Sequence, residues 1–136
     1  MSATTDYAMT YETDLSYADA IARVREALAE QGFGVLTEID VAATLKSKLG
    51  VEVAPQIILG ACSPPLARRS LESEPSIGTL LPCNVVVREG DGVTLVEAVN
   101  PEKFAVLSGN ETLGPIASEV RAKLEAALGA ATEIAA

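Results

Sequence analysis

Hydrophobic residues recur along the chain with two periods, and each change of period marks a change of secondary structure. Alternation at every second position predicts strands over 7–13 and 33–39. A helix is expected between them, with Ser16 as its N-cap and Gly32 as its left-handed stop. The first strand carries on one face Tyr7, Met9 and Tyr11. The helix buries Tyr17, Ile21, Val24 and Leu28, and the second strand is expected to carry on one face Phe33, Val35, Thr37 and Ile39.

Shorter elements follow in the middle of the chain. Asp40 is placed to cap a short helix that ends at Gly50, and its apolar positions are Val41, Leu45 and Leu49. Residues 55–62 are apolar on both faces, which predicts a strand that is central or covered on each side. Ser63 is expected to cap the next helix, whose first positions Pro64 and Pro65 need no N–H partner. Pro75 bounds this helix.

The last third predicts a hairpin and a closing helix. Residues 84–89 and 93–99 flank Gly90-Asp91-Gly92, a turn sequence typical of a β-hairpin. A helical turn is expected from Asn100 to Phe104, and a long helix from Pro115 with a stripe of Ile116, Val120, Leu124 and Leu128. The order β-α-β-β-β-β-α with short extra helices predicts an α+β fold: a largely antiparallel sheet with helices packed on one face.

One domain accounts for the whole pattern. The chain has 136 residues, which suits a single core. We expect a loose N-terminus over 1–6, the α+β domain over 7–128, and a frayed Ala-rich end over 129–136.

The hairpin strands carry apolar residues on both faces, although the helices cover only one. In 93–99, and again at Val85 to Val87, neither face is fully polar. Apolar surface left on a small protein marks a subunit interface or a ligand groove, which predicts a homodimer or a small-molecule ligand. Burial of a central strand by loops is the alternative.

Composition and charge exclude several classes of function. The chain has 10 Lys+Arg against 19 Asp+Glu, a net charge of −9, and no histidine. Triads and metal sites built on histidine are therefore excluded, and the acidity argues against a nucleic-acid or anionic-membrane partner. We expect a cytoplasmic protein, because we see no secretory signal or membrane span and only two cysteines.

Cys62 and Cys83 are the residues whose type suits redox or metal chemistry. Each is expected at one end of a strand, and Cys62 stands just before a helix N-terminus, which favours the thiolate. Their spacing fits no zinc motif, but two thiolates suit Cu(I). Buried, inert thiols are the alternative.

Two carboxylates, Glu38 and Asp40, share a face at the end of the second strand. They are the minimum for acid–base chemistry, whereas helix capping and solvent exposure explain them without it. Gly60 fits a close backbone approach.

Three segments, 32–41, 58–67 and 77–87, together resemble the bacterial and archaeal domain of unknown function 302 family over residues 10–128. The resemblance implies a fold similar to the TATA-box-binding-protein arrangement and no established activity. The chain departs from the family at Ser63, where Asn is common, and at Gln56 and Arg88, where aromatic residues are common. Fold similarity alone does not imply DNA binding.

Together these observations predict a non-catalytic homodimeric binding domain that needs no cofactor. It would use the uncovered sheet face or an adjoining cleft, whose candidate residues are Glu38, Asp40, Gly60, Ser63 and Asn84. A thiol-dependent redox or Cu(I)-binding protein is the alternative, and an enzyme using carboxylates is a third reading.

Overall fold

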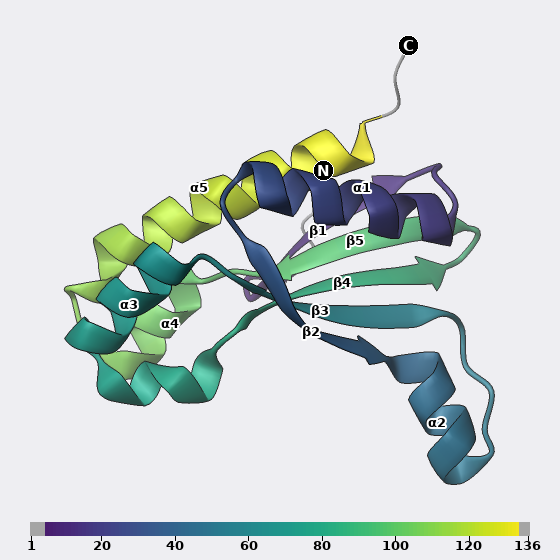
Figure 1. Ribbon diagram of the computed structural model, residues 1–136, viewed down its shortest axis with the longest axis horizontal. Helices are drawn as coiled ribbons and strands as arrows, with labels where there is room; N and C mark the ends of the chain where they lie inside the picture. Colours follow the sequence, from purple (N-terminus) through teal and green to yellow (C-terminus); the bar gives the residue numbers. More distant parts are fainter. Residues whose placement is uncertain (1–4, 134–136) are drawn as a thin grey trace.

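Five strands form one antiparallel sheet in the computed structural model, which describes residues 5–133 (Figure 1). The strands are β1 (Ala8–Thr13), β2 (Gly34–Asp40), β3 (Gln56–Cys62), β4 (Cys83–Gly90) and β5 (Val93–Val99), in the spatial order β1-β5-β4-β3-β2. The helices are α1 (Tyr17–Glu30), α2 (Val41–Leu49), α3 (Pro64–Ser73), α4 (Glu102–Ser108), α5 (Leu113–Thr132) and the 3₁₀ helix η1 (Pro75–Leu80). The predicted α+β class and antiparallel sheet are confirmed.

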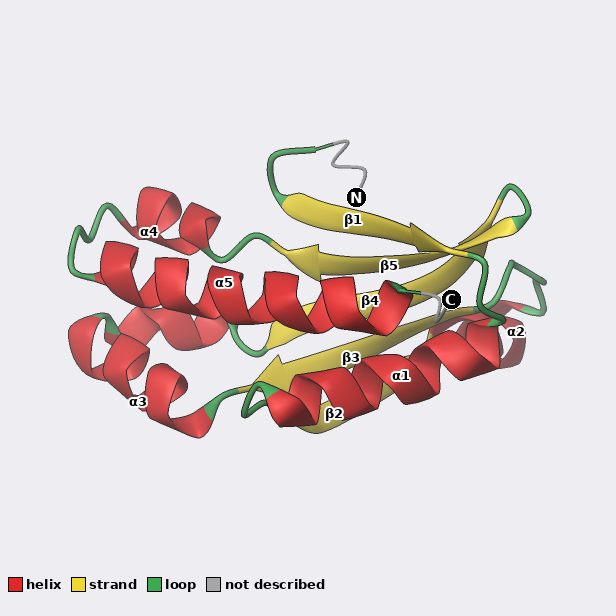
Figure 2. Cartoon of the chain, turned by 90° about the horizontal axis from the view of Figure 1, so that it is seen from above, coloured by secondary structure: helices red, strands yellow, loops and turns green. Residues whose placement is uncertain are grey.

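The core lies between the sheet and two helices on one of its faces. Figure 2 shows α1 and α5 side by side above the strands. The fully buried side chains include Val24 and Leu28 of α1, Leu124 and Leu128 of α5, and, from the sheet, Leu59, Val85, Val87 and Val96. The helical stripes that the sequence predicts are therefore the ones that fill the core.

Local signals placed several elements correctly. Ser16 Oγ accepts a hydrogen bond from the Asp19 N–H at 3.1 Å, and Asp40 Oδ1 accepts one from the Ala43 N–H at 2.9 Å. Gly50 ends α2 in the left-handed region at φ +69°. The predicted hairpin joins β4 to β5.

The second strand differs from its prediction. Its pairing with β3 shifts register between Val35 and Thr37, so that Leu36 is an extra residue. A bulge of this kind reverses which face the later side chains occupy. Phe33 is buried on the helix side, whereas Ile39 pairs with Ile58 and lies on the opposite face, so the four residues predicted to share one face do not.

The structure also corrects three predictions about where helices begin, end and are capped. Ser63 stands before α3, but its side chain makes no capping hydrogen bond. The last helix begins at Leu113 rather than Pro115, and it continues to Thr132 because Ala131 is buried and Arg23 donates to the Ala130 and Glu133 carbonyls. The frayed end predicted from 129 is thus helical to Thr132, and residues 134–136 lie outside the described residues.

The N-terminal prediction is corrected in part. Asn100 Nδ2 donates to the Asp6 carbonyl at 3.0 Å, and Lys103 pairs with the Asp6 carboxylate at 3.2 Å. Residue 6 is therefore fixed to the domain, while the rest of the predicted loose segment lies largely in residues 1–4, outside the described residues.

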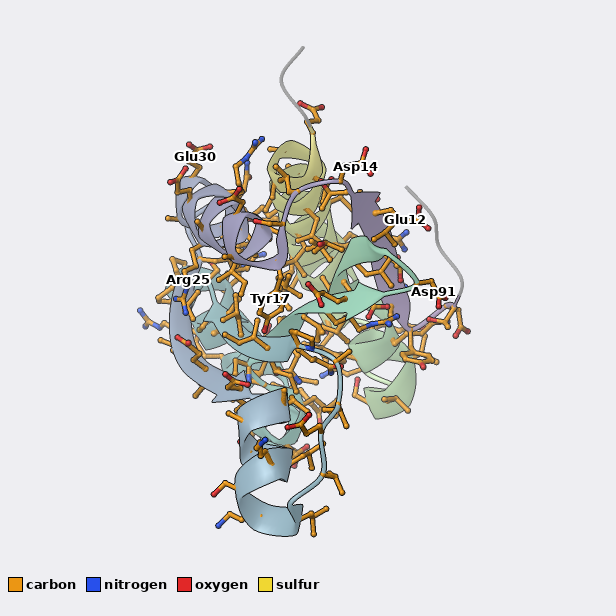
Figure 3. All side chains as sticks on the ribbon, turned by 90° about the vertical axis from the view of Figure 1, so that its right-hand side faces the viewer. Glu12, Asp14, Tyr17, Arg25, Glu30 and Asp91 are labelled. Atoms are coloured by element: carbon orange, nitrogen blue, oxygen red, sulfur yellow. The ribbon has the colours of Figure 1, made fainter. Side chains whose placement is uncertain are left out.

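Two helical projections flank the face of the sheet that α1 and α5 leave uncovered. In Figure 1, α2 descends from one end of the strands on the side away from α1 and α5, and η1 and α4 stand at the other end, where Glu102 of α4 pairs with Arg121 of α5. Figure 3 shows the same separation of α2 from α1, with α2 projecting well beyond the sheet. Within residues 5–133, no helix has the length and apolarity needed to cross a membrane.

Candidate binding face

The face of the sheet turned away from α1 and α5, here called the uncovered face, combines aliphatic with polar side chains and is only half-buried. Burial alternates along each inner strand, so the side chains that are not in the core belong to this face. Its aliphatic members are Ile39, Ile58, Val86, Val93, Leu95 and Val99. No loop of the described chain buries them fully, which disfavours the reading of a central strand sealed by loops.

Strand register arranges these residues in a row. Ile39 pairs with Ile58, Ile58 pairs with Val86, and Val86 pairs with Glu97. An aliphatic band therefore crosses three strands and ends at a single acidic residue.

A hydrogen-bonded cluster surrounds that acid. Arg88 Nε donates to Glu97 Oε1 at 2.6 Å, and Thr10 Oγ1 donates to Glu97 Oε2 at 2.9 Å. Burial would raise the pKa of Glu97, but the hydrogen bonds from Arg88 and Thr10 outweigh it and lower the pKa. The same hydrogen bond raises the pKa of Arg88.

Sequence reasoning missed this cluster as a unit. Its signal was one charged residue, Arg88 or Glu97, on one face of each of two strands, but only the register of β1, β5 and β4 shows that they meet Thr10 and each other. The cluster places an ionised pair at the end of the aliphatic band, where it gives direction to any contact made there.

A shallow groove of about 340 Å³ runs beside the cluster. It is lined by Tyr7, Ala8, Asn84, Val86, Arg88 and Val99, among others. Asn84 is the predicted cleft residue that this groove contains. An apolar lining with a few polar groups is the usual character of a small-molecule site.

The other predicted cleft residues do not gather in one place. Glu38 forms an ion pair with Arg25 of α1 on the helix side, and Asp40 is the N-cap of α2. Ser63 is buried at the start of α3. Their positions give them structural contacts and no common cavity.

Gly60 lies opposite Asn84 on the uncovered face, where the chain packs too closely for a side chain. A Cβ atom there would overlap the Thr37 hydroxyl and lie 2.7 Å from Pro82 Cγ. The close approach expected at Gly60 is thus an approach of the protein to itself.

Each cysteine stands at one end of its strand, as expected, and the two lie at the same end of neighbouring strands. Cys83 pairs with Ala61, so Cys62 is next to its partner, and both line a recess of about 30 Å³. Cys83 is buried, and burial followed by the nearby Cys62 raises its pKa to about 11. Among residues 5–133, no group of three or more Cys, Asp or Glu side chains is arranged to hold a metal ion.

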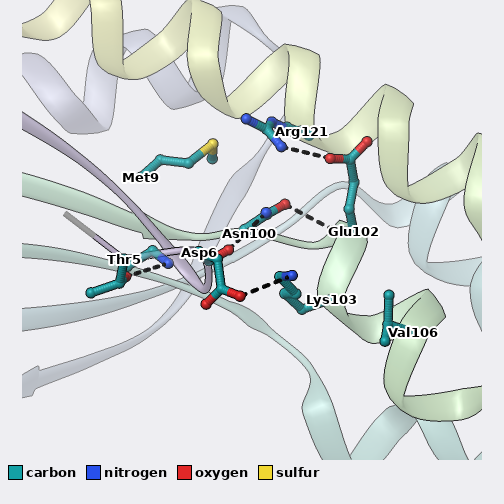
Figure 4. A pocket seen from close by; sticks show the side chains of 9 residues that line it. Thr5, Asp6, Met9, Asn100, Glu102, Lys103, Val106 and Arg121 are labelled. Atoms are coloured by element: carbon teal, nitrogen blue, oxygen red, sulfur yellow. Dashed lines mark hydrogen bonds and ion pairs between the residues drawn. The ribbon is translucent and has the colours of Figure 1, made fainter. Parts of the chain in front are cut away.

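A more polar recess of about 400 Å³ lies between the start of β1 and helices α4 and α5 (Figure 4). Its charges are already paired: Lys103 with Asp6 at 3.2 Å and Arg121 with Glu102 at 2.6 Å. Asn100 completes the arrangement by accepting from the Glu102 N–H at 3.1 Å. These contacts join α4 to the sheet and to α5.

Comparison with known proteins agrees with the fold and the sequence motifs. The family model described as "Domain of unknown function DUF302" matches residues 9–131. The chain belongs to the DUF302 family. The crystal structure of an uncharacterized conserved DUF302 protein from Bacillus stearothermophilus is similar to it, with a TM-score of 0.88 and 28% sequence identity, covering 95% of this chain and 100% of that chain. A search of curated proteins gave no significant match.

Membership of DUF302 makes two departures from the expected family pattern informative. Gln56 and Arg88 stand where aromatic residues were expected, and in the structure they are register partners on the uncovered face. This DUF302 chain therefore places a neighbouring pair of polar side chains at that point of the face.

Proposed function

We propose that this DUF302 chain is a non-catalytic binding domain that forms a homodimer through its uncovered face. The observation that carries the proposal is the half-buried aliphatic band Ile39–Ile58–Val86, which lies between two helical projections. Apolar surface of this kind is stabilised when a second apolar surface removes it from water.

The net charge supports a protein as the partner, and the two cysteines support a reducing compartment. The net charge of −9 favours a protein partner over a nucleic acid, because a nucleic acid would repel it. Both cysteines are free thiols, which fits a reducing cytoplasm. The groove beside Arg88 leaves room for a small ligand at the edge of the interface.

The thiol-based alternative has only the closeness of Cys62 and Cys83 in its favour. Cys83 is buried with a raised pKa, so its thiolate is scarce at neutral pH. We therefore retain the binding domain as the proposed function.

Sedimentation velocity tests the proposal with one charge placed in the aliphatic band. Wild-type protein at micromolar concentration is expected to sediment with twice the chain mass of 14.1 kDa. Ile58→Glu is expected to sediment as a monomer, since it would bury an unpaired carboxylate in the interface. Leu71→Glu, on exposed α3, is the matched control and should remain dimeric. A wild-type monomer at every concentration would overturn the proposal.

A further inference from the structure

Large exposed hydrophobic side chains occur in two regions: β2 with the segment that follows it, and the residue before β1 together with α4. One group belongs to β2 and to the projecting segment 41–55, here called the arm; it consists of Leu36, Ile39, Leu49, Val51 and Val53. The second, here called the far cluster, consists of Tyr7, Val106 and Leu107, beside β1 and in α4. Within the described chain, Leu71 is the only other large hydrophobic residue that is similarly exposed.

The arm is well formed but makes little contact with its own domain. None of the nine residues of α2 is buried, although Asp40 and Gly50 cap the helix and Lys46 pairs with Glu52 in the returning segment. Helices this short are marginal by themselves in water and depend on packing for stability. The arm therefore lacks the tertiary surface that a helix of its length needs.

The positions of the two groups suggest how two copies would meet. The arm stands at one end of the strands and α4 at the other, as Figures 1 and 2 both show. The arm also follows edge strand β2, whereas Tyr7 precedes the opposite edge strand β1, so the two groups lie at diagonally opposite corners of the sheet. A twofold axis in the plane of the uncovered face and perpendicular to this diagonal turns one copy over onto the other. It brings each arm to the partner's α4 end, and a twofold interface requires such reciprocal contacts.

We propose that, in the homodimer, the arm of each copy packs against the far cluster of the other. This inference rests on the proposed function, and it specifies the second copy of this chain as the occupant of both exposed groups. Leu49, Val51 and Val53 would contact Tyr7, Val106 and Leu107 of the other copy.

The area needed by a stable dimer supports a role for the arm. Five strands about 4.8 Å apart, with six to eight residues rising about 3.3 Å each, give a sheet of roughly 550 Å² in plan. Stable interfaces bury about 800 Å² on each partner. The sheet face alone falls short of that area, and the two reciprocal arm contacts extend it.

Charge at the two ends is also complementary. The arm has Lys46, Lys48 and Glu52, a net charge of +1, in a chain whose total is −9. Residues 100–112, which contain α4, have Glu102, Lys103 and Glu111, a net charge of −1. Contact between these segments reduces the repulsion that two acidic copies otherwise experience.

Pairing of two β2 edges is the competing arrangement, and the structure disfavours it. The extra residue at Leu36 interrupts the register of β2. Bulges of this kind make an edge strand a poor template for another strand.

Two substitutions and a crosslink test the arrangement on the full chain. Leu49→Glu in the arm and Leu107→Glu in the far cluster should each raise the dimer dissociation constant at least tenfold in sedimentation equilibrium. Leu71→Glu should leave it unchanged. A photo-crosslinking benzoylphenylalanine at position 49 should give a product of twice the chain mass, joined to a peptide from 100–112.

The outcomes separate this inference from the proposed function. If Ile58→Glu dissociates the dimer while both end variants remain dimeric, the arm contact is wrong and the dimer stands. A crosslink to the other copy's β2 would also overturn the arm contact, in favour of edge pairing. If the wild-type chain is a monomer, both proposals fail, and the arm is then free for a different protein.

Discussion

Two hydrogen bonds to the partly buried carboxylate of Glu97 favour its ionised form. Arg88 and Thr10 each donate to a different oxygen, so both oxygens of the ionised carboxylate accept a hydrogen bond. A lowered pKa in the folded state means that folding favours ionised Glu97. This residue therefore links the stability of the sheet to pH.

Replacing Glu97 with Gln should destabilise the protein and weaken its response to acid. The pKa of Glu97 lies below its ordinary value of 4.5, so its contribution is complete above pH 4.5 and is lost as pH falls through the folded value. At pH 7 the variant should lose about 1–3 kcal/mol, because Arg88 keeps no charged acceptor. Below pH 4.5 its unfolding free energy should fall less steeply than that of the wild type.

Urea unfolding at a series of pH values from 3 to 7 measures both effects. Glu12→Gln, an exposed carboxylate on β1, is the control. Equal slopes for Glu97→Gln and the wild type below pH 4.5 would contradict the assigned role.

The thiol of Cys83 should be unreactive in the folded protein. With a pKa of about 11, roughly one molecule in a thousand carries the thiolate at pH 8, and the sulfur is also buried. In a Cys62→Ser variant, an aromatic disulfide should titrate no thiol before unfolding and one afterwards. Prompt native reaction would restore the thiol-based alternative.

At the scale of secondary structure, elements defined by neighbours in sequence were predictable. The helix caps contact backbone only a few residues away: these are Ser16, Asp40 and Gly50. The turn at Asp91-Gly92 is equally local. Their patterns therefore placed α1, α2 and the hairpin. The bulge at Leu36 depends on the pairing of β2 with β3, which no local pattern encodes. The length of α5 likewise depends on packing of Ala131 and on Arg23, far away in sequence.

Two substitutions in α5 should have opposite effects on stability. Leu124 is fully buried against the sheet, so Leu124→Ala should cost about 2–4 kcal/mol through lost contacts and a cavity. A methyl group added at Gly129 would meet no neighbouring side chain within 4 Å, so Gly129→Ala should stabilise the helix by about 0.5–1 kcal/mol. Chemical denaturation of both variants measures the difference, and a loss below about 1 kcal/mol for Leu124→Ala would mean that this helix face is not core.

At the scale of the whole molecule, the uncovered face was predictable but its surroundings were not. Apolar residues on both sides of 93–99 indicated a sheet with one face free, and this needed only alternation. That α2 and α4 stand at opposite ends of the strands follows from strand direction: the pairings β2–β3, β3–β4 and β4–β5 are all antiparallel, so β2 and β5 run in opposite directions and lead into α2 and α4 at opposite ends. The candidate residues Glu38 and Asn84 lie on opposite faces of the sheet, because the bulge at Leu36 turns Glu38 to the helix side.

A homodimer makes thermal stability depend on protein concentration. Unfolding then converts one dimer into two chains, so a tenfold rise in concentration adds about 1.4 kcal/mol per dimer. For a dimer of this size we expect the Tm of the wild type to rise by about 2–4 °C for each tenfold increase. Ile58→Glu should have a Tm that does not change with concentration, since a monomer unfolds without a change in particle number. Differential scanning calorimetry from 10 μM to 1 mM separates the two cases. A flat wild-type Tm over this range would show that the aliphatic band stays in contact with water.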